Sequence, residues 1–262
     1  MVNTISRNMN KNTDTDAKVI FILPFRNRDT ELNKWLSTMI PILDEQYNCI
    51  GINNLDKPYE IIIPHQKDQK LFNKGALVNS ACKILLQKYG SKLMDMIMVM
   101  NDIDIYPIKS GIFDYYVEYG TARHPYGVLR PQFGGILGGL YYIRFGDFFK
   151  VGGMPNYWGW GGEDICLARR VLANGIKIDE SEFIERRTTT DIIDPVSAPT
   201  LKQRRFQEIT DKRNLRACFM ENHLKPVNGL MNCEYNILEE RYIEGFEKYE
   251  NIKMYDLVIN II

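Results

Sequence analysis

Short runs of apolar residues occur within residues 19–23, 60–64 and 96–100 of the chain. Uninterrupted runs of this length are typical of parallel strands buried on both faces of a sheet. Between them, apolar residues recur every three or four positions over residues 30–43 and 74–89, which predicts two helices. Strands and helices that alternate in this way predict an α/β fold with a doubly wound sheet.

The second half of the chain has a weaker pattern. Glycines crowd residues 128–162, which indicates tight turns and a close approach of the backbone to a ligand. Residues 164–174 are predicted to form a helix that ends at Gly175. Residues 181–228 are polar and weakly patterned, whereas alternating apolar positions near the end of residues 235–262 predict one strand. Residues 1–17 are polar, and we expect a flexible tail there.

Composition and charge narrow the class of function. The 33 Lys and Arg residues balance 33 Asp and Glu, so the chain lacks the net basic charge of a nucleic-acid binder, and we expect no nucleic-acid partner. No window reaches the ~18 apolar residues of a membrane-spanning helix, so we expect a soluble, cytoplasmic protein without an integral membrane segment. The five cysteines show no metal-ligand spacing, which favours free thiols over structural zinc.

Charged residues directly follow two of the predicted strands. Asp102 and Asp104 are two positions apart, so both carboxylates lie on one side of an extended chain and suit Mg²⁺ or Mn²⁺. Arg26 and Arg28 follow the first strand, and arginine forks suit phosphate groups. Ligands of such sheets bind at the carboxyl ends of strands, so both motifs indicate a nucleotide-diphosphate site. Solvated turns are the alternative interpretation of either motif alone.

The most specific motif is the run Trp-Gly-Trp-Gly-Gly-Glu-Asp at residues 158–164. Indole faces suit sugar rings, and glycines let a loop move or approach a ligand closely. Glu163 and Asp164 fall at the start of a predicted helix, where a carboxylate can accept the proton of a substrate hydroxyl. A core turn followed by an acidic helix cap is the alternative.

Together, several runs resemble the β-1,4-galactosyltransferase family of inverting glycosyltransferases (glycosyltransferase family 7). The resemblance implies one GT-A domain over residues 18–262, a Rossmann-like sheet flanked by helices, with a donor-binding half at about 18–110 and an acceptor-binding half at about 111–262. Because the membrane stem and disulfide positions of animal members are absent, a soluble microbial or viral member is favoured. The matching runs are residues 25–28, 72–75, 102–104, 133–135, 157–164, 204–206 with Ile209, and 228–230 with Tyr235.

The resemblance also implies roles for individual residues. Asp164 would be the catalytic base, Glu163 would hold sugar hydroxyls, and Asp104 would ligate Mn²⁺ or Mg²⁺. The donor would be a UDP-sugar that carries galactose or N-acetylgalactosamine, and the acceptor a GlcNAc-like sugar on a glycan or glycolipid. Donor-binding residues would be Pro24, Phe25, Arg26, Arg28, Phe72, Lys74, Asp102, Gly135 and Trp160. Acceptor-binding residues would be Trp160, Gly161, Gly162, Glu163, Asp164, Arg205, Phe206 and Ile209.

Some positions depart from the family pattern. The family's Met-x-x-His metal-ligand pair is missing: either Asp191, Asp194 or His223 substitutes for it, or the metal site is weaker or differently built, and a structural role is favoured for His223. Gln132 stands where galactosyltransferases carry an aromatic residue near the donor sugar, which leaves the hexose open. The stretch 212–227 is longer than usual. A nucleotidyltransferase and a glycan-binding protein with altered catalysis are the alternative functions.

Overall fold

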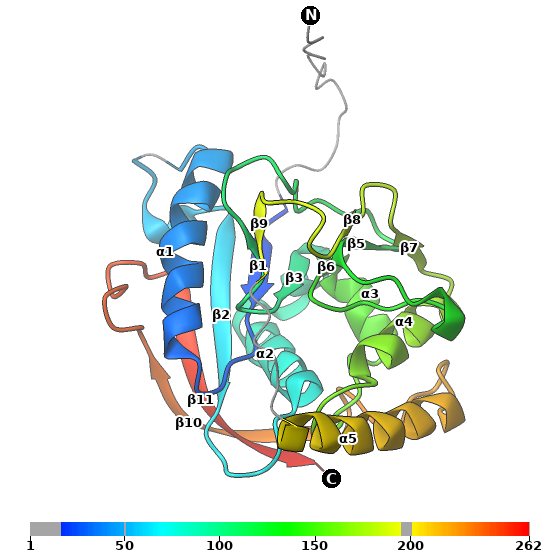
Figure 1. Ribbon diagram of the computed structural model, residues 1–262. Helices are drawn as coiled ribbons and strands as arrows, with labels where there is room; N and C mark the ends of the chain where they lie inside the picture. Colours follow the sequence, from blue (N-terminus) through cyan, green and yellow to red (C-terminus); the bar gives the residue numbers. More distant parts are fainter. Residues whose placement is uncertain (1–16, 50, 195–200, 262) are drawn as a thin grey trace, which may run out of the picture.

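The computed structural model describes residues 17–49, 51–194 and 201–261, except for the side chains of residues 201–206. Within this part of the chain, nine strands form one mixed sheet in the order β10-β11-β2-β1-β3-β6-β5-β7, with β8 beside β5 (Figure 1). The strands are β1 (Val19–Ile22), β2 (Tyr59–Gln66), β3 (Ile97–Asn101), β5 (Thr121–Gly127), β6 (Leu140–Arg144), β7 (Lys177–Asp179), β8 (Ile184–Glu185), β10 (Cys233–Arg241) and β11 (Ile252–Ile261).

Helices cover both faces of this sheet. One hydrophobic cluster contains Trp35 of α1 together with Phe21 of β1, and the other contains Leu77 of α2 and Leu167 of α4 together with Ile20 of β1. Alternate residues of β1 therefore enter opposite cores, which is why the strand is apolar throughout. The helices are α1 (Asp29–Gln46), α2 (Lys74–Tyr89), α3 (Phe145–Lys150), α4 (Glu163–Ala173) and α5 (Leu201–Met220), with short 3-10 turns at Asn54–Asp56, Gly90–Asp95 and Pro131–Phe133.

Parallel pairing brings the predicted ligand-binding ends together. β1 pairs in parallel with both β2 and β3, so the chain leaves β1 and β3 at the same edge of the sheet. β6 runs antiparallel to β3 and begins at that edge, where Leu140 is opposite Asn101. The amide of Asp102 donates to the carbonyl of Gly139 at 2.8 Å, which ties the acidic run to the glycine-rich segment.

The structure confirms the predicted strands and helices of the first half and the helix that ends before Gly175. The weakly patterned stretch 181–228 differs, because it contains the 20-residue helix α5 and the short strand β9 (Ile192–Ile193), which pairs with β4 (Tyr106–Pro107). The single strand expected at residues 235–262 is instead the antiparallel hairpin of β10 and β11. Residues 1–16 of the expected tail lie outside the described residues.

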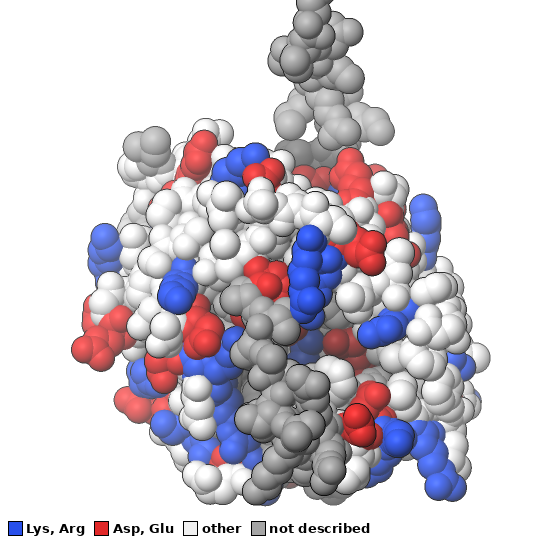
Figure 2. Space-filling view, viewed as in Figure 1, with Lys and Arg blue, Asp and Glu red and all other residues white. Residues whose placement is uncertain are grey.

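Three features bear on the composition argument. On the face shown in Figure 2, basic and acidic side chains are interspersed, so this face carries no extended basic field. Among the described helices, none is both long enough and apolar enough to cross a bilayer. All five cysteines are buried and none forms a disulfide.

Candidate active site

A cleft of about 970 Å³ opens at the sheet edge where β1 and β3 end. It collects side chains from the end of β1, the start of α2, the acidic run after β3, the glycine-rich segment and the start of α4. Most of the residues predicted from the sequence therefore meet in one place. Those that line the cleft are Pro24, Arg26, Arg28, Phe72, Lys74, Asp102, Asp104, Gln132, Trp160, Gly161, Gly162, Glu163 and Asp164.

Lys74 lies between two carboxylates at the centre of this cleft. Its Nζ is 3.1 Å from Asp164 Oδ1 and 3.2 Å from Asp102 Oδ1, and its side chain is only 10% exposed. The position of Lys74 follows from the local sequence, because the side chain of Asn73 caps α2 by accepting a hydrogen bond from the amide of Ala76 at 2.9 Å. Lys74 is thus held at the first turn of α2, facing the cleft.

Burial and the neighbouring carboxylates shift the pKa of Lys74 in opposite directions. Burial lowers the pKa of Lys74, but the carboxylates of Asp102, Asp164 and Glu163 outweigh it and raise the pKa well above the usual range. Burial raises the pKa of Asp102, although the ammonium of Lys74 partly offsets this. Lys74 is therefore a fixed positive charge that compensates several acids.

Glu163 and Asp164 are adjacent in sequence but differ in environment. Burial, followed by the nearby charge of Asp164, raises the pKa of Glu163 to about 8, and its Oε2 is buried with no hydrogen-bond partner in the part of the chain that the structure describes. Asp164 instead forms the ion pair with Lys74. At neutral pH, Glu163 therefore carries a proton that it can donate in a hydrogen bond, whereas the ion-paired Asp164 is the group suited to accept one.

This difference predicts a pH-dependent effect of Glu163→Gln on stability. The raised pKa means that the folded protein loses stability as pH rises from the unfolded-state value near 4.5 through 8, because Glu163 must then ionise while buried. We expect Glu163→Gln to raise the unfolding free energy by about 2 kcal/mol at pH 9 and to change it little at pH 5. Denaturant unfolding at both pH values measures this. Glu208→Gln, on the exposed side of α5, is the control, and an equal effect of Glu163→Gln at both pH values would contradict the assignment.

Glycines place Asp164 at the start of α4. Gly159, Gly161 and Gly162 all have positive φ, and Gly162, at +82°, is the residue that caps the helix. A methyl group on Gly138 would lie 2.5 Å from Asp164 Oδ2, so the absence of a side chain there leaves room for the carboxylate. The rotamer of Asp164 therefore depends on a residue in a different segment.

We expect Gly138→Ala to displace the Asp164 carboxylate without removing it. Gly138 does not have a positive φ, so alanine fits the backbone and the added methyl acts through the contact alone. The loss of any activity that uses Asp164 should be about 10- to 100-fold, with stability changed by less than about 1 kcal/mol. Steady-state rates and thermal melts test this. Gly146→Ala in α3, where an added methyl would lie 3.2 Å from the carbonyl of Met94, is the control and should leave the rate unchanged.

Arginines and the acidic run face each other across the cleft. Arg28 Nη2 is 3.0 Å from Asp104 Oδ2, and Arg26 donates to the carbonyl of Lys70 at 2.6 Å. The carboxylates of Asp102 and Asp104 both line the cleft, and together they provide the oxygen-only donor set that Mg²⁺ and Mn²⁺ prefer. The residues present therefore fit a hard divalent cation.

The loop that contains the two tryptophans and three glycines, residues 158–162 (the Trp-Gly loop), packs directly on α5. Thr210 Oγ1 donates to the carbonyl of Trp160 at 2.9 Å and lies 3.2 Å from its amide nitrogen. A methyl on Gly161 would meet Asp211 Oδ1 at 2.2 Å. The indole of Trp160 is 58% exposed, so it is available to a ligand while its backbone is held by the helix.

Some residues predicted for the site do not line the cleft. Phe25 is buried, and its ring meets that of His65 edge-on at 4.8 Å. Gly135 and Ile209 lie outside the lining, and Ile209 is exposed on α5. The side chains of Arg205 and Phe206 are outside the described residues. The donor and acceptor roles of these five residues stay predictions.

The suggested additional metal ligands do not line the cleft either. Asp194 is ion-paired with Arg186 and accepts a hydrogen bond from Tyr126, and Asp191 pairs with Lys109 at 2.8 Å. His223 lies in a separate cluster with Cys166 and Glu221. That one of these three residues ligates the metal of the cleft stays a prediction.

Sequence reasoning missed three charged residues that do line the cleft, namely Arg130, Arg186 and Asp211. Arg130 follows β5, Arg186 follows β8, and Asp211 lies within α5. All three belong to segments without a clear hydrophobic period. The Arg-Arg doublet at residues 186–187 was the one signal that the sequence offered for them.

Comparison with known proteins places this arrangement in a family. A model described as the N-terminal region of glycosyl transferase group 7 matches residues 2–113, and one described as the N-terminal domain of galactosyltransferase matches residues 128–192. The two matches together span more than half of the chain and include the acidic run and the Trp-Gly loop. The chain belongs to glycosyl transferase group 7.

Individual members of group 7 are similar over much of the chain. Beta-1,4-galactosyltransferase 1 of Bos taurus is 32% identical over 174 residues, which is 64% of this chain but only 39% of that protein. Beta-1,4-galactosyltransferase 7 of Drosophila melanogaster is 25% identical over 233 residues, which is 85% of this chain and 64% of that protein. The chain thus spans about two fifths of the length of the bovine relative.

The fold of a group 7 member has been solved in complex with ligands. A crystal structure of a mutant Drosophila beta-1,4-galactosyltransferase 7 with manganese, UDP-Gal and xylobiose matches with a TM-score of 0.63 and 19% identity, over 94% of this chain and 95% of that one. The match confirms the GT-A arrangement expected from the sequence.

Proposed function

We propose that the chain is an inverting glycosyltransferase that moves a hexose from a UDP-sugar to a sugar hydroxyl. The observation that carries this proposal is the cleft itself, in which the candidate base Asp164 lies with further acids, the shared lysine Lys74 and several arginines. An exposed tryptophan on a glycine loop lies beside them. The relation to beta-1,4-galactosyltransferases supports the same reaction class.

The mechanism follows from the charges around the cleft. Asp164 accepts the proton of the acceptor hydroxyl as that oxygen attacks the anomeric carbon from the face opposite the diphosphate, so one displacement inverts the configuration. Arg26, Arg28 and Lys74 supply the positive charge that stabilises the departing UDP. Glu163, protonated at neutral pH, donates a hydrogen bond to a sugar hydroxyl.

A divalent cation fits this scheme at the acidic run. Asp104 would hold the ion and Asp102 would lie beside it, and when bound the ion neutralises charge on the diphosphate. Arg28, which now pairs with Asp104, would be released toward the phosphates. The manganese in the Drosophila structure supports Mn²⁺ as the first ion to test.

We infer the donor and acceptor from the residues of the cleft and from the ligands of the related Drosophila enzyme. UDP-Gal and xylobiose in the Drosophila complex support a galactose donor and a sugar acceptor. Gln132 lines the cleft near the glycine-rich segment, and its amide can hydrogen-bond a hexose substituent, so N-acetylgalactosamine belongs in the same panel. The acceptor proposed from the sequence is a GlcNAc-like sugar on a glycan or glycolipid. The five unpaired cysteines support a reducing, cytoplasmic setting.

One experiment separates this function from the alternatives. The purified chain is incubated with Mn²⁺, a panel of UDP-hexoses, and β-linked GlcNAc or xylose acceptors, and UDP release and product mass are followed. We expect UDP release that requires both acceptor and metal, together with a β-linked product. Sugar binding without turnover for any donor would indicate a glycan-binding protein, and release of pyrophosphate would indicate a nucleotidyltransferase.

A further inference from the structure

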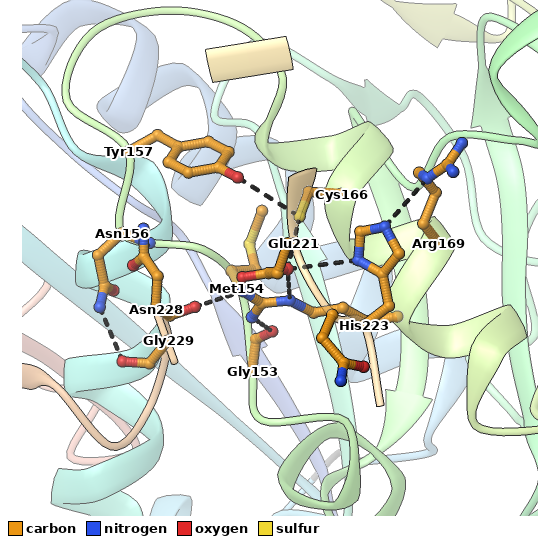
Figure 3. Close-up of polar contacts among 12 residues, drawn as sticks. Gly153, Met154, Asn156, Tyr157, Cys166, Arg169, Glu221, His223, Asn228 and Gly229 are labelled. Atoms are coloured by element: carbon orange, nitrogen blue, oxygen red, sulfur yellow. Dashed lines mark hydrogen bonds and ion pairs between the residues drawn. The ribbon is translucent and has the colours of Figure 1, made fainter. Parts of the chain in front are cut away.

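A second polar cluster lies outside the cleft, where α4 meets the chain just beyond α5. Glu221 Oε2 is 3.1 Å from Cys166 Sγ and 3.3 Å from His223 Nδ1, and Figure 3 shows the carboxylate between the other two side chains. One potential ligand atom from each of the three lies within 4.8 Å of the others. This arrangement brings together the sulfur, nitrogen and oxygen atoms that bind transition metals.

A second thiol lies next to this cluster. Cys218 belongs to the same small buried cluster as Cys166, and both residues are fully buried. Cys218, Glu221 and His223 all fall within residues 212–227, the stretch that is longer than in the resembling family. Cys166 comes from α4, more than fifty residues earlier. Packing of α4 against α5 and the chain just beyond it brings Cys166 to the other three, which is why the spacing of the cysteines gave no metal signal.

We propose that Cys166, Cys218, Glu221 and His223 bind a structural zinc ion. Zinc bonds of about 2.0–2.3 Å in a tetrahedron place neighbouring ligand atoms roughly 3.4 Å apart, close to the separations around Glu221 Oε2. Two thiolates and a carboxylate carry three negative charges, of which the buried guanidinium of Arg170 offsets one. A divalent cation neutralises the remaining two.

The surroundings hold the proposed ligands in place. Arg170 is fully buried and donates to Glu221 through Nε at 2.8 Å and Nη2 at 2.5 Å, and to the carbonyl of Gly153 at 2.7 Å. Tyr157 donates its hydroxyl to Cys166 Sγ at 3.6 Å. These contacts fix the carboxylate and one sulfur before any ion arrives, as outer ligands do in zinc sites.

Protons must leave or move when zinc binds. The imidazole nitrogen Nδ1 of His223 lies 3.3 Å from Glu221 Oε2, while Arg169 donates to Nε2 at 3.1 Å, so the ring proton is on Nδ1. Zinc at Nδ1 shifts the ring proton to Nε2, so Arg169 gives up that bond and keeps its bond to the carbonyl of Phe133 at 3.2 Å. The two thiols each release one proton, and no redox step is involved.

Cobalt substitution tests this site without relying on activity. The full chain is freed of metal under reducing conditions and titrated with Co²⁺, because thiolate-bound Co²⁺ gives a sulfur-to-metal charge-transfer absorption whereas an oxygen-only site does not. We expect one such Co²⁺ per chain, displaced by an equal amount of Zn²⁺.

Variants then assign the ligands. Cys166→Ser and His223→Gln should weaken zinc binding at least tenfold, and Cys166→Ser should also reduce the charge-transfer band. Cys49→Ser, a buried thiol elsewhere, and Asp104→Asn, in the cleft, should keep both. Because His223 is near the surface, His223→Gln should fold, and circular dichroism of each metal-free variant checks this. No charge-transfer band in the wild-type chain, or a band unchanged by Cys166→Ser, would overturn the proposal.

Discussion

Replacing Asp164 with asparagine is expected to lower kcat for sugar transfer by about 10³-fold. Asparagine keeps the shape of the side chain and an oxygen that can still accept a hydrogen bond from Lys74, but its amide cannot take a proton from an acceptor hydroxyl. The affinity for UDP should change by no more than about threefold, because Asp164 contributes to chemistry rather than to holding the nucleotide.

Measurement of kcat and of the UDP dissociation constant in the same preparation checks this split. Asp56→Asn, at an exposed position remote from the cleft, is the matched control and should behave as wild type. Turnover of Asp164→Asn within tenfold of wild type would assign the base to another group. Glu163 is then the next candidate, and its raised pKa would appear as a shifted pH profile.

The second large effect is expected at Lys74. Methionine has a similar length but no charge, so Lys74→Met leaves Asp102 and Asp164 without the cation that they share. We expect the unfolding free energy at pH 8 to fall by about 2 kcal/mol, discounted for the partial exposure of both acids. The deficit should shrink below about pH 5, where the carboxylates of the variant take up protons.

Lys74→Arg is the informative control for this prediction. It restores the positive charge at the same place and should recover most of the stability at pH 8. Because the same side chain faces the proposed diphosphate, Lys74→Met should also lower kcat/KM for the donor by about 100-fold. A methionine variant as stable as wild type at pH 8 would show that the three charges are already well solvated.

The first half of the fold was predictable because its elements are buried on both sides. β1 and all but the last residue of β3 are apolar, and both strands lie between two helix layers, as such runs predict. α2 was also predicted with its observed bounds, since Asn73 caps its beginning and Gly90 follows its end. Parallel pairing of these strands was enough to predict that the charged runs after β1 and β3 lie at one edge of the sheet.

The second half was harder to predict for a physical reason. Over residues 207–220, the buried positions of α5 include the small or polar residues Thr210, Asn214 and Cys218 rather than a continuous apolar stripe. Some contacts join segments that are distant in the sequence, such as Gly138 with Asp164 and Cys166 with Glu221. These contacts produce no repeating pattern of residue types from which they could be predicted. The acids next to the predicted strands and the Trp-Gly loop were therefore predictable, whereas Asp211 and the residues that orient the acids were not.

The close packing of the Trp-Gly loop on α5 has a consequence for how this chain can diversify. Gly159 and Gly162 approach Thr210 and Asn214 so closely that no side chain fits at either glycine. A recombination that imports this loop from a relative without its own partner helix would therefore create collisions at once. The loop and α5 are some fifty residues apart in the sequence, but each has to match the other. A chimaera that changes acceptor preference therefore has to take both segments from the same relative.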